Sequence, residues 1–93
     1  MIKHNEYFAG AVQSLTLDDH DKPATVGVMS VGRYEFGTEA AELMKVIEGE
    51  LIVKLPGTED WITYLSGTQF HVPANSKFQL QVPVSTAYLC VYG

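Results

Sequence analysis

Apolar and polar residues alternate along most of this chain in short runs separated by turn-forming residues. The clearest runs are residues 24–31 (ATVGVMSV), 61–65 (WITYL), 69–72 (QFHV), 77–82 (KFQLQV) and 86–92 (TAYLCVY). A period of two is typical of a strand with one buried face, and clusters of Gly, Pro, Asn and Asp end such strands. The pattern therefore predicts an antiparallel all-β domain.

The first half of the chain fits the same interpretation with less regularity. An opening strand region ends at the polar cluster 18–23 (DDHDKP), and Glu48-Gly49-Glu50 is expected to form a tight hairpin turn between strands. Residues 38–46 (TEAAELMKV) are rich in helix formers. Gly37 and Gly49 leave little room for a helix, so we expect the second half of this segment to be strand.

About eight short strands without a helix predict a sandwich, a barrel or a jelly roll, and closing the sheet would remove its exposed edges. The 93 residues are expected to form a single domain, residues 1–93. A chain of this size buries only about 60–65% of its extended surface, so shared burial would stabilise it. We therefore expect a homodimer.

Composition excludes several partners. The net charge is −5, and only one of the six cationic residues is arginine, which makes nucleic acid an improbable ligand. No apolar run is long enough to span a bilayer, and residues 1–8 do not resemble a signal peptide. The single cysteine, Cys90, rules out an internal disulfide and fits a reducing compartment. We expect a cytoplasmic protein with no membrane partner.

Two glycine-led motifs resemble the signature motifs of the cupin family, which are small jelly-roll β-barrels. In the first, Gly32 opens GRYEFGTEAAELMKVIEG, and in the second, Gly67 opens GTQFHVPANSKF. In metal-binding cupins the first motif supplies two histidines and a glutamate, and the second supplies another histidine. This chain retains the glutamate as Glu42 but has phenylalanine at the last position, Phe78. The resemblance therefore implies a cupin-type jelly-roll barrel that lacks the usual metal ligands.

Phe36 and Thr38 stand near the positions of the paired histidines. Asn75 replaces the usual glycine of the second motif, and asparagine tolerates the same left-handed backbone conformation.

A closer resemblance covers nearly the whole chain. The chain is similar to the small cupins called pyrimidine/purine nucleoside phosphorylases. The similar segments are NEYFAGAV, VGVM, the run from GRYEF to the LP at residues 55–56, DW…Y, F-VP, F-LQV and YLCVY. The resemblance implies phosphorolysis of diverse purine and pyrimidine ribonucleosides to free base and α-D-ribose 1-phosphate. It also implies that inorganic phosphate is the co-substrate and that neither a metal nor another cofactor is needed.

Strand parity predicts which side chains face the interior. Tyr34, Phe36 and Thr38 share one face, Glu42, Met44 and Val46 continue it, and Phe78, Leu80 and Val82 face them. Such a lining suits a flat base and a sugar better than a metal ion. We take Glu42 as the candidate catalytic residue, and the candidate substrate-binding residues are Tyr34, Phe36, Thr38, Met44, Lys77, Phe78 and Tyr88.

Each assignment has a simpler structural alternative. Phe36 and Phe78 are more often plain core residues. Glu42 is equally consistent with a surface position, although a carboxylate on an apolar interior strand would indicate function. Tyr34 and Tyr88 fit the mouth of a barrel with hydrated hydroxyl groups. Lys77 fits a solvated surface position, and Arg33, Thr38 and Ser76 are other candidate phosphate donors.

Histidine and cysteine give no strong catalytic signal. His4, His20 and His71 share no metal-ligand spacing, and Cys90 alternates with Tyr88 and Tyr92 as a packed thiol would. Three functions remain open on the residues alone: a metal-independent phosphorylase, a non-catalytic cupin that binds a small sugar or nucleoside, and a metal-dependent cupin that uses Glu42 with His71.

Overall fold

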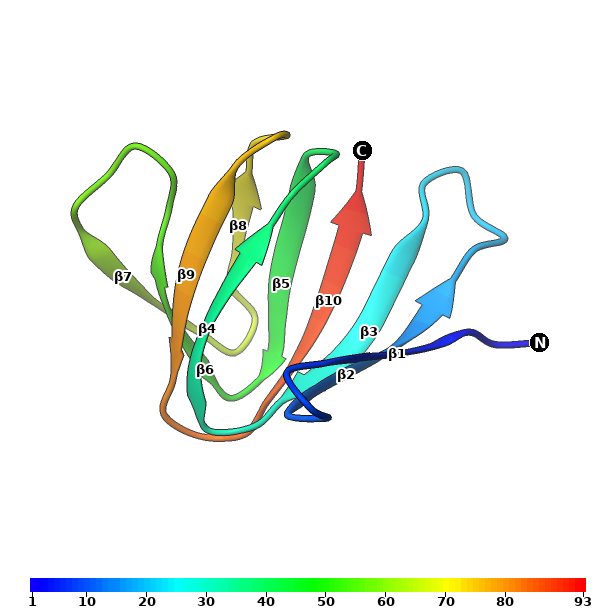
Figure 1. Cartoon of the computed structure of the whole chain (residues 1–93), viewed down its shortest axis with the longest axis horizontal. Coiled ribbons are helices and arrows are strands. Elements are labelled where there is room, and N and C mark those ends of the chain that lie inside the picture. The colour runs from blue at the N-terminus through cyan, green and yellow to red at the C-terminus, as the bar shows by residue number, and fades with distance from the viewer.

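The computed structural model describes residues 1–93 and contains ten β-strands and no helix (Figure 1). The larger sheet has the order β1 (His4–Tyr7), β2 (Val12–Leu17), β3 (Ala24–Met29), β10 (Thr86–Tyr92), β5 (Glu42–Glu48) and β8 (Gln69–Val72). The smaller sheet has the order β4 (Gly32–Gly37), β9 (Lys77–Val82), β6 (Glu50–Lys54) and β7 (Trp61–Leu65). All neighbouring strands are antiparallel.

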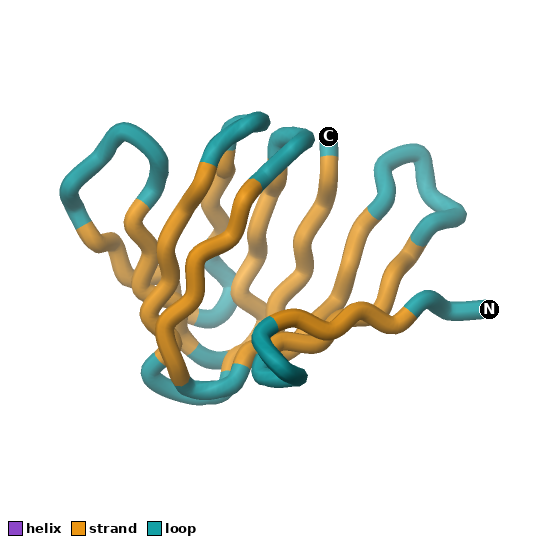
Figure 2. Tube along the Cα trace, viewed as in Figure 1, coloured by secondary structure: helices purple, strands orange, loops and turns teal.

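The two sheets are joined by loops and share no strand (Figure 2). The prediction of an all-β jelly roll is therefore confirmed, but the backbone hydrogen bonds do not continue from one sheet into the other to close a barrel. As a result, β1 and β8 are edges of the larger sheet, and β4 and β7 are edges of the smaller one. The structure contains no helix with the length and apolar character needed to cross a membrane.

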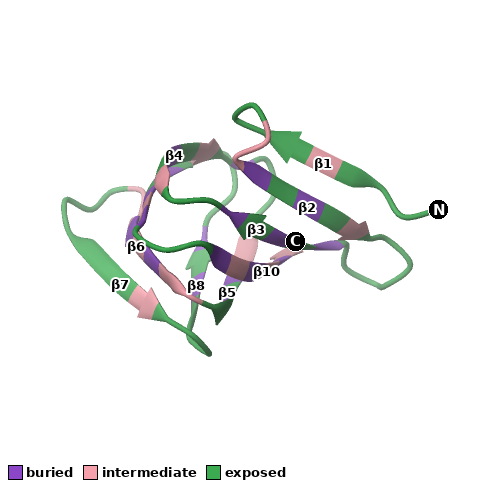
Figure 3. Cartoon of the chain, turned by 90° about the horizontal axis from the view of Figure 1, so that it is seen from below, coloured by how far each residue is buried: buried purple, intermediate pink, exposed green.

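The core lies between the inner faces of the sheets. Buried residues alternate with exposed ones along most strands, whereas β1 and β7 are mostly exposed (Figure 3). On β9, for example, Phe78, Leu80 and Val82 are buried, while Gln79 lies on the other face and donates a hydrogen bond to Glu35. This placement confirms the inward parity that the sequence predicts for the second motif.

The turn around Gly49 is not the predicted hairpin. β5 pairs with β10 and β8, whereas β6 pairs with β7 and β9, so Gly49 takes the chain from one sheet to the other. Gly49 has φ 117°, and a Cβ atom there would lie 2.4 Å from Thr86 Oγ1. Thr86 closes the corner, because its hydroxyl accepts a hydrogen bond from Glu50 N at 3.0 Å. β5 and β6 each bury one face in the same core. Their alternation of apolar and polar residues is therefore the same whether or not the two strands pair with each other.

The two glycine-led motifs meet at a shared loop contact. Thr38 N donates to Ser76 O at 2.8 Å, and Thr38 Oγ1 donates to Pro73 O at 2.7 Å. Ser76 N in turn donates to Thr38 Oγ1 at 3.0 Å. Asn75 has φ 54°, the left-handed conformation expected of it. This arrangement fixes the turn that places Phe78 opposite Phe36 in the β4–β9 pair.

Residues 38–41 are a loop with a bend at residues 39 and 40, and β5 begins at Glu42. The expectation that strand replaces helix in the second half of this segment is confirmed.

Candidate functional site

A cavity of about 360 Å³ opens between the inner faces of the two sheets. Its volume lies within the range of about 300–1,000 Å³ that small-molecule sites usually have. Nine of its thirteen lining residues are hydrophobic. Five of the predicted site residues contribute to it: Phe36, Glu42, Met44, Phe78 and Tyr88.

One side of the cavity is aromatic. Phe36 and Phe78 are register partners, and their rings stack with centroids 5.9 Å apart and planes 28° apart. Tyr7, from the edge strand β1, meets Phe36 edge to face at 6.1 Å. Phe36 and Phe78 also belong to the packing of the core, so their structural role and their position in the cavity wall coexist. The wall presents flat apolar surface to whatever enters.

Glu42 supplies a partly buried carboxyl group to the cavity. It is the first residue of β5 and pairs with Tyr92 of β10, so its side chain shares the inner face with Tyr92. Burial raises the pKa of the Glu42 carboxyl above its ordinary value, and a hydrogen bond donated by Cys90 Sγ at 3.5 Å opposes that rise. Glu42 therefore lies between the two alternatives, half-buried in the cavity wall and neither fully buried nor fully exposed.

Three residues of β10, Tyr88, Cys90 and Tyr92, line the cavity on the side of Glu42. Burial raises the pKa of Tyr88 to about 12, and nearby Cys90 and Tyr7 act in the same direction. Burial also raises the pKa of the Cys90 thiol and of Tyr92. All three groups therefore stay protonated at neutral pH and can donate hydrogen bonds, and a protonated thiol is a poor nucleophile.

Tyr88 approaches the backbone of β3 closely. A Cβ atom at Gly27 would lie 2.6 Å from Tyr88 Oη and 2.7 Å from the carbonyl oxygen of Gln13. Glycine at position 27 thus makes room for the tyrosine hydroxyl beneath the larger sheet. With only 5% of its surface exposed, Tyr88 is not a residue with a hydrated hydroxyl at the mouth.

Three predicted site residues do not line the cavity. Tyr34 is buried and donates a hydrogen bond from its hydroxyl to Ser30 O at 2.8 Å, so it too is not a mouth residue. Thr38 uses its hydroxyl in the loop contact described above. Lys77 is exposed on a neighbouring polar recess, which shares Gly37 and Glu39 with the cavity.

Sequence reasoning missed several lining residues, among them Tyr7, Ser14, Glu39 and Tyr92, which bring polar groups to the cavity. Strand alternation could have predicted Tyr92, because it lies on the same face of its strand as Tyr88 and Cys90. Tyr7 gave no such signal, since its position depends on how the edge strand β1 lies over the cavity.

The cavity contains no lysine, arginine or histidine, and its two acidic residues are Glu39 and Glu42. Nowhere in the structure do three side chains of the types His, Cys, Asp or Glu gather as a metal-binding group. His71 lies on an exposed position of β8.

A family model and individual relatives place the chain in the same protein family. The model of the family described as pyrimidine/purine nucleoside phosphorylase matches residues 2–92. A protein of that name from Pseudomonas fluorescens (strain Pf0-1) is 58% identical over 92 residues, which cover 99% of this chain and 98% of that protein. One from Pseudomonas savastanoi pv. phaseolicola (strain 1448A / Race 6) is 60% identical over 92 residues, or 99% of each chain.

Solved structures agree with the fold. The crystal structure of a protein of unknown function from Vibrio parahaemolyticus has a TM-score of 0.96 and 53% identity, covering 100% of this chain and 99% of that one. An RmlC-like cupin from Shewanella frigidimarina NCIMB 400 has a TM-score of 0.77 at 20% identity, covering 99% of this chain and 81% of that one, and shows the fold alone. The chain therefore has the cupin fold and belongs to the pyrimidine/purine nucleoside phosphorylase family.

Proposed function

We propose that the protein catalyses phosphorolysis of purine and pyrimidine ribonucleosides, without a metal ion. In this reaction an oxygen of inorganic phosphate forms a bond to C1′ of the ribose as the bond from C1′ to the base nitrogen breaks. The base leaves with the bonding electrons and takes up a proton, and the sugar leaves as α-D-ribose 1-phosphate. The observation that carries the proposal is a cavity with an aromatic wall and a partly buried carboxyl group, in a chain of this family.

Glu42 is the proposed catalytic residue. As its bond to the base weakens, C1′ gains positive charge, and an ionised carboxylate in a site shielded from water stabilises such charge. The same carboxylate can accept hydrogen bonds from the 2′- and 3′-hydroxyls of the ribose. Tyr88 and Tyr92 remain protonated beside it and are available to donate hydrogen bonds to the sugar or to the departing base.

Broad specificity follows from the apolar wall. Phe36, Met44 and Phe78 offer packing surface and no hydrogen-bonding groups for the edge of a base. Every base has a flat π-face, so stacking does not distinguish strongly between purines and pyrimidines.

Phosphate needs positive partners, and the cavity itself supplies none. Lys77 is the proposed phosphate-binding residue, because its recess adjoins the cavity at Gly37 and Glu39. The hydroxyls of Thr38 and Ser76 bond to carbonyl oxygens within the loop, which leaves the ammonium group of Lys77 as the main donor there.

A product assay tests the function directly. Purified protein is incubated with uridine or adenosine, with and without phosphate and with and without EDTA, and free base is quantified. Phosphate-dependent release that persists in EDTA is the expected result. Loss of release in EDTA would contradict metal independence, whereas tight nucleoside binding with no release would favour the alternative, a non-catalytic cupin that binds a nucleoside or a small sugar.

The proposed assembly is a homodimer formed through the outer face of the larger sheet. Leu15 and Val26 are cross-strand partners on β2 and β3, and Val26 is also the partner of Leu89 on β10. Leu15, Val26 and neighbouring Val28 are exposed apolar residues on this face. A second copy of the chain, packed with the same face against this one, would bury these apolar side chains. A small chain buries a smaller fraction of its surface on folding than a large one, so it gains more from this additional burial.

A further inference from the structure

The turn between β1 and β2 has an unusual backbone. Phe8 and Ala9 have φ values of 53° and 55°, and Gly10 follows with φ 89°. Left-handed backbone is unfavourable for residues with a side chain, and such conformations gather at functional sites. The turn bends tightly, with Gly10 N donating to Tyr7 O at 3.2 Å and Ala11 N donating to Phe8 O at 3.1 Å.

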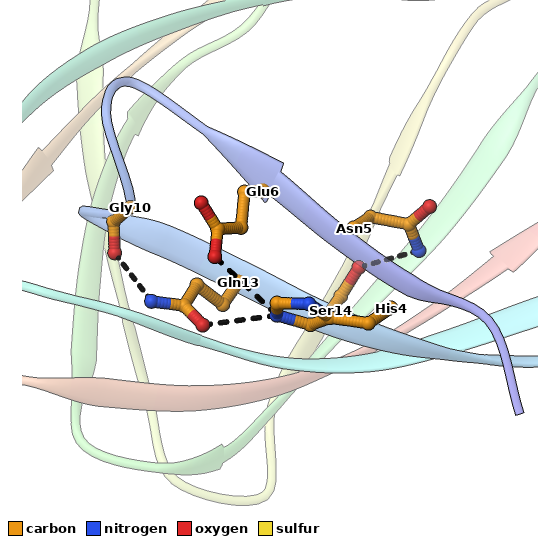
Figure 4. A network of polar contacts seen from close by, with 6 residues as sticks. All are labelled: His4, Asn5, Glu6, Gly10, Gln13 and Ser14. Atoms are coloured by element: carbon orange, nitrogen blue, oxygen red, sulfur yellow. Dashed lines mark hydrogen bonds and ion pairs between the residues drawn. The ribbon is translucent and has the colours of Figure 1, made fainter.

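Side chains behind the turn hold it in this conformation (Figure 4). Gln13 Nε2 donates to Gly10 O at 2.9 Å, and Gln13 Oε1 lies 3.0 Å from His4 Nε2. Asn5 Nδ2 donates to Ser14 Oγ at 3.2 Å, so a second contact ties β1 to β2. These contacts lie within the β1–β2 hairpin and hold its strands together, while β2 pairs with β3 of the larger sheet. From this hairpin Tyr7 and Phe8 contact aromatic rings of β4 in the smaller sheet.

The two aromatic rings bridge a gap between sheets. β1 is an edge of the larger sheet and β4 is an edge of the smaller sheet, and the two strands do not pair. Phe8 lies 5.0 Å from the ring of Tyr34 and 5.4 Å from Phe36, measured between centroids. Tyr7 and Phe8 nevertheless remain 43% and 48% exposed. Ring contacts thus join β1 to β4 in place of backbone pairing, and Tyr7 and Phe36 among them line the cavity.

We propose that Tyr7 and Phe36 form the nucleobase subsite, and that the side chain of Tyr7, next to a turn that is itself held in place, moves to admit the base. This inference rests on the proposed function. Tyr7 lines the cavity together with Phe36 and lies on its exposed side, whereas Glu42 lies with the buried thiol of Cys90. A nucleoside placed with its base at the aromatic mouth would put its ribose beside Glu42.

In the present geometry, the rings of Tyr7 and Phe36 leave no room for a base between them. Tyr7 and Phe36 are 6.1 Å apart with planes at 80°. A base stacked between two rings needs them parallel and about 7 Å apart, two contacts of about 3.5 Å each. Tyr7 must therefore turn and move by roughly 1 Å. Because only ring contacts hold it against β4, this movement breaks no backbone hydrogen bond between the sheets.

The test compares ligands with and without a base. Uridine, adenosine and α-D-ribose 1-phosphate are titrated by calorimetry into the wild type and into Tyr7→Ala, Tyr7→Leu and Tyr7→Phe. Loss of a stacking partner should weaken nucleoside binding by about tenfold, more for adenosine than for uridine. Ribose 1-phosphate, which has no base, should bind unchanged. Tyr7→Phe should bind nucleosides like the wild type, because it keeps the flat ring.

The matched control is Trp61→Ala, which removes an aromatic residue of similar exposure, 42%, from β7 on the other side of the molecule. It should leave all three affinities unchanged. Equal weakening of nucleosides and ribose 1-phosphate in Tyr7→Ala, or normal nucleoside binding in Tyr7→Leu, would overturn the subsite. Base-dependent binding in a wild type that releases no base would overturn the proposed function and leave the subsite standing.

Discussion

The thiol of Cys90 donates a hydrogen bond to the carboxyl group of Glu42, with 3.5 Å between Sγ and Oε1. The bond joins β10 to β5 on the inner face of the larger sheet. It opposes the effect of burial on the pKa of Glu42, which is raised overall. The cysteine thus acts on the candidate catalytic group as a hydrogen-bond donor, and its own raised pKa keeps it protonated.

The first prediction concerns the pH profile. If ionised Glu42 stabilises the transition state, kcat/KM falls as the pH drops through the raised pKa of Glu42. Cys90→Ala removes the donor that lowers this pKa, so the acid limb should move to higher pH. Cys90→Ser replaces the thiol with a stronger donor, so the limb should move to lower pH. Shifts in the same direction for both variants would contradict the assigned interaction.

Glu42→Gln should cut kcat by about 10²- to 10³-fold, the usual loss when a group that stabilises transition-state charge is removed. Full activity in this variant would refute the role of Glu42.

The same substitution should stabilise the fold at neutral pH. The folded-state pKa of Glu42 is above its ordinary value of 4.5, so the charged form destabilises the native state. The contribution of Glu42 to stability is therefore most favourable below that value and is lost as pH rises through the folded pKa. Glu42→Gln should have a higher Tm than wild type at neutral pH, by about 4–8 °C for each kcal/mol, and no advantage near pH 4. Thermal unfolding at the two pH values measures this difference.

Lys77→Ala should raise the KM for phosphate by about tenfold, because a hydrogen-bonded charge pair is lost, while the KM for uridine stays the same. Lys3→Ala is the matched control, since it removes the same charge from an exposed position outside the cavity and its neighbouring recess. Equal effects of the two substitutions would show that only overall charge matters.

Gly27→Ala should destabilise the protein by about 1–3 kcal/mol, the usual cost of overpacking a core. The added methyl group would meet Tyr88 Oη at 2.6 Å and the backbone oxygen of Gln13 at 2.7 Å, and the backbone atom cannot rotate away. Gly37→Ala is the control, because the nearest atom to its added Cβ is Ser76 O at 3.9 Å. Chemical denaturation of both variants gives the comparison, and equal stability would argue against a tight contact at Gly27.

The strands and their inward faces were predictable because a half-buried strand repeats every two residues. Phe78, Leu80 and Val82 are buried as this period requires. Glu42 and Met44 were also found by parity, and both line the cavity. The alternation of apolar and polar residues was sufficient to predict whether a side chain faces the interior wherever that depends only on its own strand.

Features that depend on two strands were not predictable in this way. The crossing at Gly49 depends on which strands pair, and the register between β5 and β10 shifts at Ala87 and Tyr88. That shift helps determine which residue of β10 meets Glu42, so the Cys90 bond was beyond sequence reasoning. Tyr7 was missed for a related reason, since its place over Phe36 depends on a left-handed turn at Phe8 and Ala9.

The last prediction tests the homodimer. Val26 lies between Leu15 and Leu89 in a row of apolar partners on the outer face of the larger sheet. A glutamate there would place two like charges against each other across a symmetric interface, and burying them unpaired is costly. Light scattering should give about twice the 10.3 kDa chain mass for wild type and the chain mass itself for Val26→Glu. Ile62→Glu, at a similarly exposed position on β7, should remain dimeric, and a monomeric wild type at micromolar concentration would refute the proposed assembly.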